Sequence, residues 1–305
     1  TMSVRFVVVT DTHYHPTALR DWGAPKMLTR SREVLAASVP AINAVEADFI
    51  IHGGDLVCGG GSFDLSTIDY ELSIQDVAAE YAKLRAPIHY VPGNHDSDAQ
   101  TGSFERLFET FPIPRLLDVV DVAPGVRLAL ANIYHAAPLI GRWSDELDQA
   151  LRRADAAARE DHCALLLVLH EWILPNLVRP GDDDDVGCIE GASVLRDTLI
   201  DCTSVVATFS GHRHVNRLRL WRDIVLVDTA CLIGHPLGFR EIVLEEDGFL
   251  QSHFHVLDCP DLLEASRYRS SREANERYEG EELDRNGVLL APRLQRIWAW
   301  RQRQS

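Results

Sequence analysis

Five stretches of the sequence place carboxylate, amide or imidazole side chains directly after short apolar runs. Such groups are costly to bury without partners, and they are the types that bind metal ions or transfer protons. A single histidine after a strand is more often a hydrogen-bonded core residue, but five such groups in one chain indicate a shared site. The five stretches are DTH (11–13), GD (54–55), GNHD (93–96), His170 and GHRH (211–214).

The stretches supply two carboxylates, one amide and four imidazoles as candidate metal ligands: Asp11, His13, Asp55, Asn94, His170, His212 and His214. This mixture of oxygen and nitrogen ligands favours Mn, Fe or Zn over Ca or Mg. Seven ligands are too many for one ion and suit two ions that share a carboxylate. Two divalent ions would keep a positive surplus over the two aspartates, which would bind a phosphate and lower the pKa of a bridging water. The set therefore predicts hydrolysis of a phosphoester.

The spacing within two of the stretches indicates how the side chains point. Asp11 and His13 are two residues apart, as are His212 and His214. On extended backbone, residues two apart face the same side. We therefore expect the members of each pair to point together.

Strands must deliver these residues to one place. Apolar runs precede the motifs, and predicted helices separate many of these runs, which suggests an α/β sandwich of mixed sheets. In such sheets, sites lie beyond the carboxyl ends of the strands. The predicted strands are 4–10, 49–51, 88–91, 126–131, 163–170, 205–214, 224–227, 240–244 and 250–256, and the predicted helices are 26–47 (broken or kinked at Pro40), 69–84, 145–159 (N-capped by Ser144) and 193–201.

Composition limits the class of protein. The chain has 305 residues, 46% of them hydrophobic and 25% charged, which is typical of a globular protein. Its formal net charge of −16 argues against a general nucleic-acid binder, and no apolar run reaches membrane-spanning length. The six scattered cysteines indicate reduced thiols. Because the N-terminal apolar run resembles a core strand more than a secretion signal, we expect a cytoplasmic protein.

Residues 260–305 differ in character from the rest of the chain. They are highly charged, with an aromatic cluster near the end, which predicts a helical extension anchored by tryptophan; a lid or a homodimer contact is the alternative. The run Asp182–Asp185 is interpreted as an exposed loop, because consecutive carboxylates cannot all face one ion.

The ordered motifs resemble those of the calcineurin-like metallophosphoesterase superfamily, DxH, GD, GNH[DE], H and GHxH, over residues 4 to about 245. The resemblance implies a four-layer α/β/β/α sandwich of two mixed β-sheets flanked by helices, with a catalytic domain over 1–259. It also implies that His95 protonates the leaving-group oxygen or stabilises the charge on the phosphoryl group, and that Asp96 orients His95. The implied ligands are Asp11, His13, Asp55 and His214 for one metal, and Asp55, Asn94, His170 and His212 for the other.

Departures from the superfamily's patterns bear on the substrate. The protein serine/threonine phosphatases continue the second motif as GDxVDRG, whereas this chain reads GDLVCGGG, with Cys58 and Gly59 in place of Asp and Arg. Loss of the arginine removes a phosphate-binding fork and disfavours a phosphoprotein substrate. The GNHD form is similar to the small-molecule branch, which includes class III cyclic-nucleotide phosphodiesterases.

Several functions remain open at this level. The leading hypothesis is a binuclear-metal phosphohydrolase that uses a metal-bridging hydroxide on small phosphodiesters, of the cyclic-nucleotide or nucleotide-like kind, or on phosphomonoesters. A phosphatase of nucleotide or sugar monoesters is the alternative. A nuclease is disfavoured by charge, and a non-catalytic scaffold by the complete ligand set. His15 and His135 are candidate substrate contacts, although a surface or packed role is the simpler interpretation of each.

Overall fold

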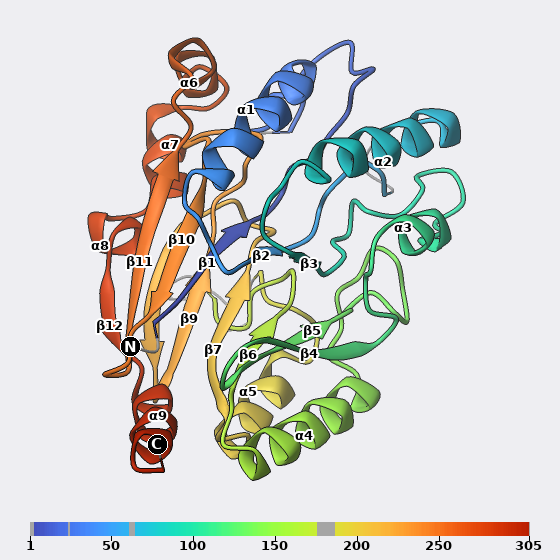
Figure 1. The fold of residues 1–305 in the computed structure, drawn as a ribbon. Coiled ribbons are helices and arrows are strands. Elements are labelled where there is room, and N and C mark those ends of the chain that lie inside the picture. Colours follow the sequence, from blue (N-terminus) through green and yellow to red (C-terminus); the bar gives the residue numbers. More distant parts are fainter. Residues whose placement is uncertain (1–2, 24, 61–64, 176–186, 305) are drawn as a thin grey trace.

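The computed structural model describes residues 3–23, 25–60, 65–175 and 187–304, so the run Asp182–Asp185 lies outside the described residues. Two six-stranded mixed β-sheets pack face to face, and helices flank the pair on both sides (Figure 1). The predicted sandwich of two mixed sheets flanked by helices is therefore confirmed. Within the described ranges, no helix is both long and apolar enough to cross a membrane.

The first sheet has the strand order β12-β11-β10-β1-β2-β3. Strands β1, β2 and β3 run parallel, whereas β10, β11 and β12 join them by antiparallel pairing. The strands are β1 (Val4–Val9), β2 (Phe49–His52), β3 (Ile88–Tyr90), β10 (Gly238–Leu244), β11 (Phe249–Val256) and β12 (Val288–Leu290).

The second sheet has the order β4-β5-β6-β7-β9-β8, with a parallel centre of β5, β6, β7 and β9 between two antiparallel edge strands. Its strands are β4 (Leu117–Ala123), β5 (Val126–Ala131), β6 (Ala164–Val168), β7 (Val205–Ser210), β8 (Arg217–Trp221) and β9 (Ile224–Asp228).

The helices are η1 (Leu28–Arg30), α1 (Ser31–Asn43), α2 (Thr67–Tyr81), α3 (Glu105–Thr110), α4 (Asp145–Glu160), α5 (Ala192–Asp201), α6 (Pro260–Arg267), α7 (Arg272–Glu279), α8 (Glu282–Arg285) and α9 (Pro292–Gln302).

The central strands are apolar on both faces because both faces are covered. In β1, Phe6 and Val8 belong to the cluster between the sheets, whereas Val7 and Val9 pack with α1 and α6 on the outer side. The same alternation holds in β6, where Leu166 faces the other sheet. Burial on both faces explains why these runs read as continuous hydrophobic stretches in the sequence.

The elements differ from the sequence prediction in a few places. Helix α1 begins at Ser31 and continues through Pro40 to Asn43, and the predicted strand 205–214 ends at Ser210, so its histidines lie in the following loop. Strands β4, β8 and β12 were not predicted. All three lie at sheet edges and are partly exposed; β4 and β8 mix polar and apolar residues, and β12 is only three residues long. Ser144 caps α4 as predicted, accepting a hydrogen bond from the Leu147 amide.

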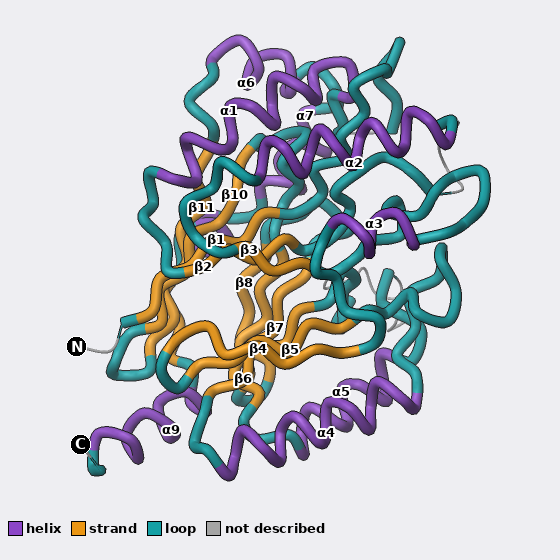
Figure 2. The backbone as a smooth tube through the Cα atoms, turned by 45° about the vertical axis from the view of Figure 1, so that its right-hand side comes forward, coloured by secondary structure: helices purple, strands orange, loops and turns teal. Residues whose placement is uncertain are grey.

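The segment 260–305 packs onto the two sheets. Its strand β12 extends the first sheet beside β11, and α9 lies beneath the sheets (Figure 2). Trp298 of α9 is fully buried in the cluster between the sheets, together with Leu294. The aromatic residue therefore closes one end of the main core.

Replacing Trp298 by alanine is expected to destabilise the protein by about 3–5 kcal/mol, because it removes a large buried side chain from the core. Urea unfolding followed by circular dichroism measures this loss. Trp300→Ala is the matched control on the same helix; this partly exposed residue should cost on the order of 1 kcal/mol. Equal losses for the two variants would show that α9 does not close the core.

Candidate metal centre

All five motifs lie in loops directly after parallel strands, three in the first sheet and two in the second. Backbone hydrogen bonds tie these loops together. The amide of Asp11 donates to the Gly54 carbonyl at 3.0 Å, and that of His13 to the Asp55 carbonyl at 2.9 Å. Parallel strands thus deliver the motifs to one edge of the sandwich, as expected for α/β sheets.

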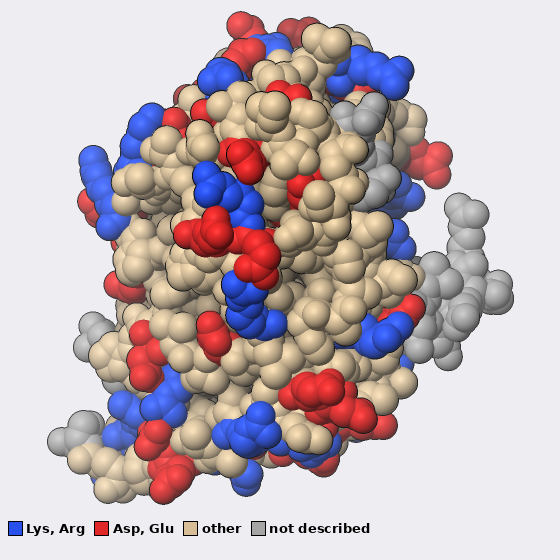
Figure 3. Space-filling model, turned by 90° about the vertical axis from the view of Figure 1, so that its right-hand side faces the viewer, with Lys and Arg blue, Asp and Glu red and all other residues tan. Residues whose placement is uncertain are grey.

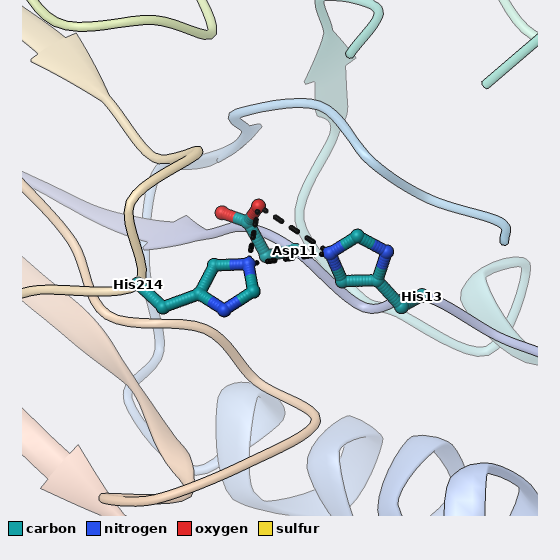
Figure 4. Close-up of side chains that lie close together, drawn as sticks. All are labelled: Asp11, His13 and His214. Carbon is teal, nitrogen blue, oxygen red and sulfur yellow. Dashed lines mark hydrogen bonds and ion pairs between the residues drawn. The ribbon is translucent and has the colours of Figure 1, made fainter. Parts of the chain in front are cut away.

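Asp11, His13 and His214 form a first cluster of ligand atoms that lie within 4.8 Å of one another (Figure 4). Asp11 Oδ1 is 3.2 Å from His214 Nε2 and 3.7 Å from His13 Nε2. All three side chains are buried. One oxygen and two imidazole nitrogens thus converge on one point.

Asp55, His170 and His212 form a second cluster of the same kind. Asp55 Oδ2 lies 3.2 Å from His170 Nε2, and on its other side 3.5 Å from His13 Nε2 of the first cluster. Asn94 adds its Oδ1 atom 3.2 Å from His212 Nδ1. The Asp55 carboxylate therefore stands between the two clusters.

Each aspartate has one oxygen anchored and the other presented to the cluster. Asp11 Oδ2 accepts hydrogen bonds from Thr10 Oγ1 at 2.6 Å and from the His212 amide at 3.0 Å. Asp55 Oδ1 accepts from the His95 amide at 2.8 Å. These donors fix the direction of the second oxygen, as outer partners of metal ligands commonly do.

The donor set fits metal ions. His170 Nδ1 lies 2.7 Å from the Gly53 carbonyl, which turns Nε2 toward the cluster. Asp11 Oδ1 and His170 Nε2 are buried and make no hydrogen bond of normal geometry. Buried polar atoms without such partners are uncommon, and here they face the clusters of carboxylates and imidazoles that mixed-ligand metals prefer.

The backbone at the site departs from the sequence prediction. Five candidate ligands have left-handed backbone, with φ between +40° and +66°: Asp11, His13, Asp55, His212 and His214. The expectation of extended backbone for the two pairs was therefore wrong. Asp11 and His13 nevertheless point together, whereas His214 joins them and His212 joins the other cluster. Such strain is held at functional sites by the surrounding structure.

Two motif glycines are required by close approach. A Cβ atom on Gly93 would lie 2.1 Å from Asp55 Oδ1, and one on Gly211 would lie 2.4 Å from Asp11 Oδ2. Both distances are far below van der Waals contact. Glycine therefore precedes the ligands at 94 and 212 so that the neighbouring loops can reach the aspartates.

Burial and charge pairing set the protonation of the ion-free site. Burial alone would raise the pKa of Asp11, but the neighbouring imidazoles, His214 first, hold the pKa well below its usual value. Burial would lower the pKa of His170, but Asp55 and Asp11 raise it to about 10. Burial lowers the pKa of His212 to about 3, with the charge of His170 in the same direction.

His95 and Asp96 occupy different environments at the site. His95 forms a third group of possible ligand atoms with His13 and Asp55, all within 4.8 Å of one another. His95 Nδ1 lies 3.1 Å from the Gly59 carbonyl, and its ring centroid is 5.1 Å from that of His13. Asp96 is fully buried and accepts hydrogen bonds from the Gly93 and Val57 amides. Burial and nearby Asp55 raise the pKa of Asp96 to about 8. These hydrogen bonds of Asp96 hold the loop that carries His95.

The two candidate substrate contacts lie outside these clusters. His135 Nε2 is 2.9 Å from Ser144 Oγ, at the N-cap of α4, and the His15 amide donates to Ser31 Oγ. Sequence reasoning missed Thr10, whose hydroxyl anchors Asp11. Its place between a strand and the first motif was the available signal.

Comparison with known proteins places this site in a family. The family model described as calcineurin-like phosphoesterase matches residues 4–216. A probable cyclic nucleotide phosphodiesterase from Synechococcus sp. is 27% identical over 214 residues, which cover 65% of this chain and 79% of the relative.

Solved structures share the fold. A dimetal phosphatase from Danio rerio has a TM-score of 0.63 at 16% identity, covering 82% of this chain and 95% of its own. A purple acid phosphatase from yellow lupin (Lupinus luteus) has a TM-score of 0.57 at 13% identity, covering 84% of this chain and 52% of its own. With the family model matched over most of its length, the chain belongs to the calcineurin-like phosphoesterase family and is a metal-dependent phosphoesterase.

Proposed function

We propose that the protein is a binuclear-metal phosphohydrolase that acts on small phosphodiesters of the cyclic-nucleotide or nucleotide-like kind. The observation that supports this most is the position of Asp55. Its Oδ2 atom lies 3.5 Å from His13 and 3.2 Å from His170, between the two ligand clusters. A carboxylate in this place can bridge two ions, which is the arrangement used for in-line displacement at phosphorus.

The clusters divide into two sets that share Asp55. When bound, the metal pair would supply Lewis acidity and a water of lowered pKa. Mn, Fe and Zn all suit this mixed oxygen and nitrogen set. The proposed holders are Asp11, His13, Asp55 and His214 for one ion, and Asp55, Asn94, His170 and His212 for the other.

We assign proton transfer to His95. Its Nδ1 faces the Gly59 carbonyl, so Nε2 is the atom that would give a proton to the leaving-group oxygen. Burial lowers the pKa of His95, and a bound phosphoester anion would favour its protonated form. Asp96 acts on His95 through the loop, by fixing the Gly93 amide on which the motif turns.

Comparisons with known proteins support the substrate class. The Synechococcus relative is described as a probable cyclic nucleotide phosphodiesterase, and a diester is therefore the first choice. Hydrolysis of nucleotide or sugar monoesters is the alternative, since solved neighbours are described as phosphatases. A non-catalytic scaffold is disfavoured because all seven candidate ligands are present.

Surface charge disfavours a polynucleotide substrate. On the face shown in Figure 3, the described lysines and arginines alternate with acidic residues rather than forming a basic stripe. The net charge of −16 acts in the same direction. We therefore propose a small-molecule substrate.

All six cysteines of the protein are free thiols. Free thiols suit the reducing cytoplasm, which we propose as the location of the protein.

Asp55→Asn is expected to reduce turnover more than about 100-fold, because even outer partners of metal ligands typically contribute 10–100-fold. Activity and metal content, measured by elemental analysis, should fall together. Asp197→Asn, an exposed position on α5, is the matched control and should retain both. Near-normal turnover by the Asp55 variant would contradict a bridging role.

Substrate preference is tested with a nitrophenyl monoester and a bis-nitrophenyl diester, each with added Mn²⁺ and after chelation. We expect chelator-sensitive turnover that favours the diester. A preference for the monoester would support the phosphatase alternative. Metal-loaded protein that turns over neither compound would favour a narrow substrate gate or a scaffold.

Metal affinity is expected to rise with pH between 6 and 9. In the ion-free protein Cys231 and Asp11 outweigh burial and raise the pKa of His214 to about 9, and the pKa of His170 is about 10. Both imidazoles are therefore protonated at pH 7 and must lose a proton to bind metal. Calorimetric titration with Zn²⁺ in buffers of different ionisation enthalpy should show release of about two protons per two ions. A metal affinity that does not change with pH over this range would overturn the assignment of His170 and His214 as metal ligands.

A further inference from the structure

A cavity of about 570 Å³ lies outside the metal centre, between β8 and the C-terminal helices α7 and α8. One wall comes from Asn216, Arg217 and Arg219, and the other from residues of the extension that include Arg277 and Asp284. Val215, the residue after His214, also lines it. The cavity is therefore separate from the ligand clusters but begins next to one of them.

The carboxylates that line the cavity are engaged by the protein itself. Asp284 accepts hydrogen bonds from the Leu218 amide at 3.1 Å and from the Glu281 amide at 2.9 Å. Glu281 completes a capping box by accepting from the Asp284 amide. Glu276 pairs with Arg272 at 2.7 Å. The acidic groups thus serve helix capping and a surface ion pair.

Two donors of the cavity wall lack acceptors. Asn216 is fully buried, and its Oδ1 accepts from the Ala230 amide at 3.1 Å and from Arg240 Nη2 at 2.7 Å. Those two donors fix the amide orientation, so the atom left without a partner is the Nδ2 donor. Arg219 Nε is buried without an acceptor as well, although its terminal nitrogens donate to the Leu174 and Pro175 carbonyls.

The lining holds three arginines and three acidic residues, and two of the arginines have no ion-pair partner among the described residues. Arg217 is paired with Asp228 at 2.7 Å, but Arg219 and Arg277 form no ion pair with any described residue. Arg240 is fully buried beneath Asn216, and its guanidinium donates to neutral oxygens. Burial lowers the pKa of Arg240 to about 10, and burial together with Arg217 lowers the pKa of Arg219.

We propose that this cavity binds a small phosphate-type oxyanion, held by Asn216 Nδ2, Arg219 Nε and the Arg277 guanidinium. N–H donors without an acceptor and guanidinium groups without an ion-pair partner are features that recognise tetrahedral oxyanions. The ligand is either free phosphate or the phosphate group of an ester. The site does not rest on the function proposed for the metal centre.

The test is calorimetric titration of the metal-loaded protein with inorganic phosphate. We expect two phosphates per chain, one at the metal centre and one in the cavity. Arg277→Glu, a charge reversal at an exposed position, should weaken the binding of the cavity phosphate at least about tenfold. It should leave the affinity of the phosphate at the metal centre unchanged. Arg219→Gln should also weaken the binding of the cavity phosphate. If the metal centre binds no phosphate, one phosphate remains and responds to the same two variants.

The control is Arg222→Glu, on the turn between β8 and β9 and outside the cavity lining. It should leave both affinities unchanged. Equal weakening by Arg222→Glu, or a single phosphate per chain with an affinity that Arg277→Glu does not alter, would overturn the proposal. Methylphosphonate, a stable ester analogue, separates the sources: binding to the cavity supports an esterified ligand, and binding of inorganic phosphate alone supports free phosphate.

Discussion

The structure depends on keeping the Asp55 carboxylate ionised in a fully buried position. Removing a charge from water is costly unless partners compensate. Here the compensation comes from the His95 amide on one oxygen and from the imidazoles of His13 and His170 near the other. The neighbours outweigh burial and hold the pKa of Asp55 below its usual value. The same pairing raises the pKa of His170, so the ion-free site carries protons where the proposed metals would sit.

This constraint explains the architecture around the site. Residues from five separate loops must reach two carboxylates, and parallel strands from both sheets bring the loops to one edge. The loops can come close to the carboxylates only where side chains leave room. Gly93 and Gly211 leave room that any Cβ atom would fill, and the ligands adopt left-handed backbone to turn toward the centre. Packing of the strands between two layers of helices stabilises a local conformation that would be unfavourable alone.

Much of this could be predicted from the sequence, and the failures have physical causes. The apolar runs identified the central strands because burial on both faces leaves few polar positions in them, and residue types alone picked out the candidate ligands. The edge strands β4 and β8 were not predicted because half-exposed strands carry mixed side chains, and β12 was not predicted because its apolar run is only three residues long. The division of His212 and His214 between clusters followed from the family resemblance but not from spacing, because side-chain alternation assumes extended backbone and these residues are left-handed. The direction in which a loop side chain points is set by hydrogen bonds to other parts of the fold. The spacing of residues in the sequence does not reveal these hydrogen bonds.

The part of the chain beyond the family match completes both sheets. The match ends at residue 216, yet β8 and β9 complete the second sheet, and β10 to β12 complete the first. Tyr278 of α7 packs against Trp172 and Val215, which follow the candidate ligands His170 and His214 by two residues and one residue. The extension therefore contacts the walls next to the metal centre. Because the ligand motifs are common to the family, features that distinguish this enzyme from its relatives are to be sought where α7 and α8 meet β8.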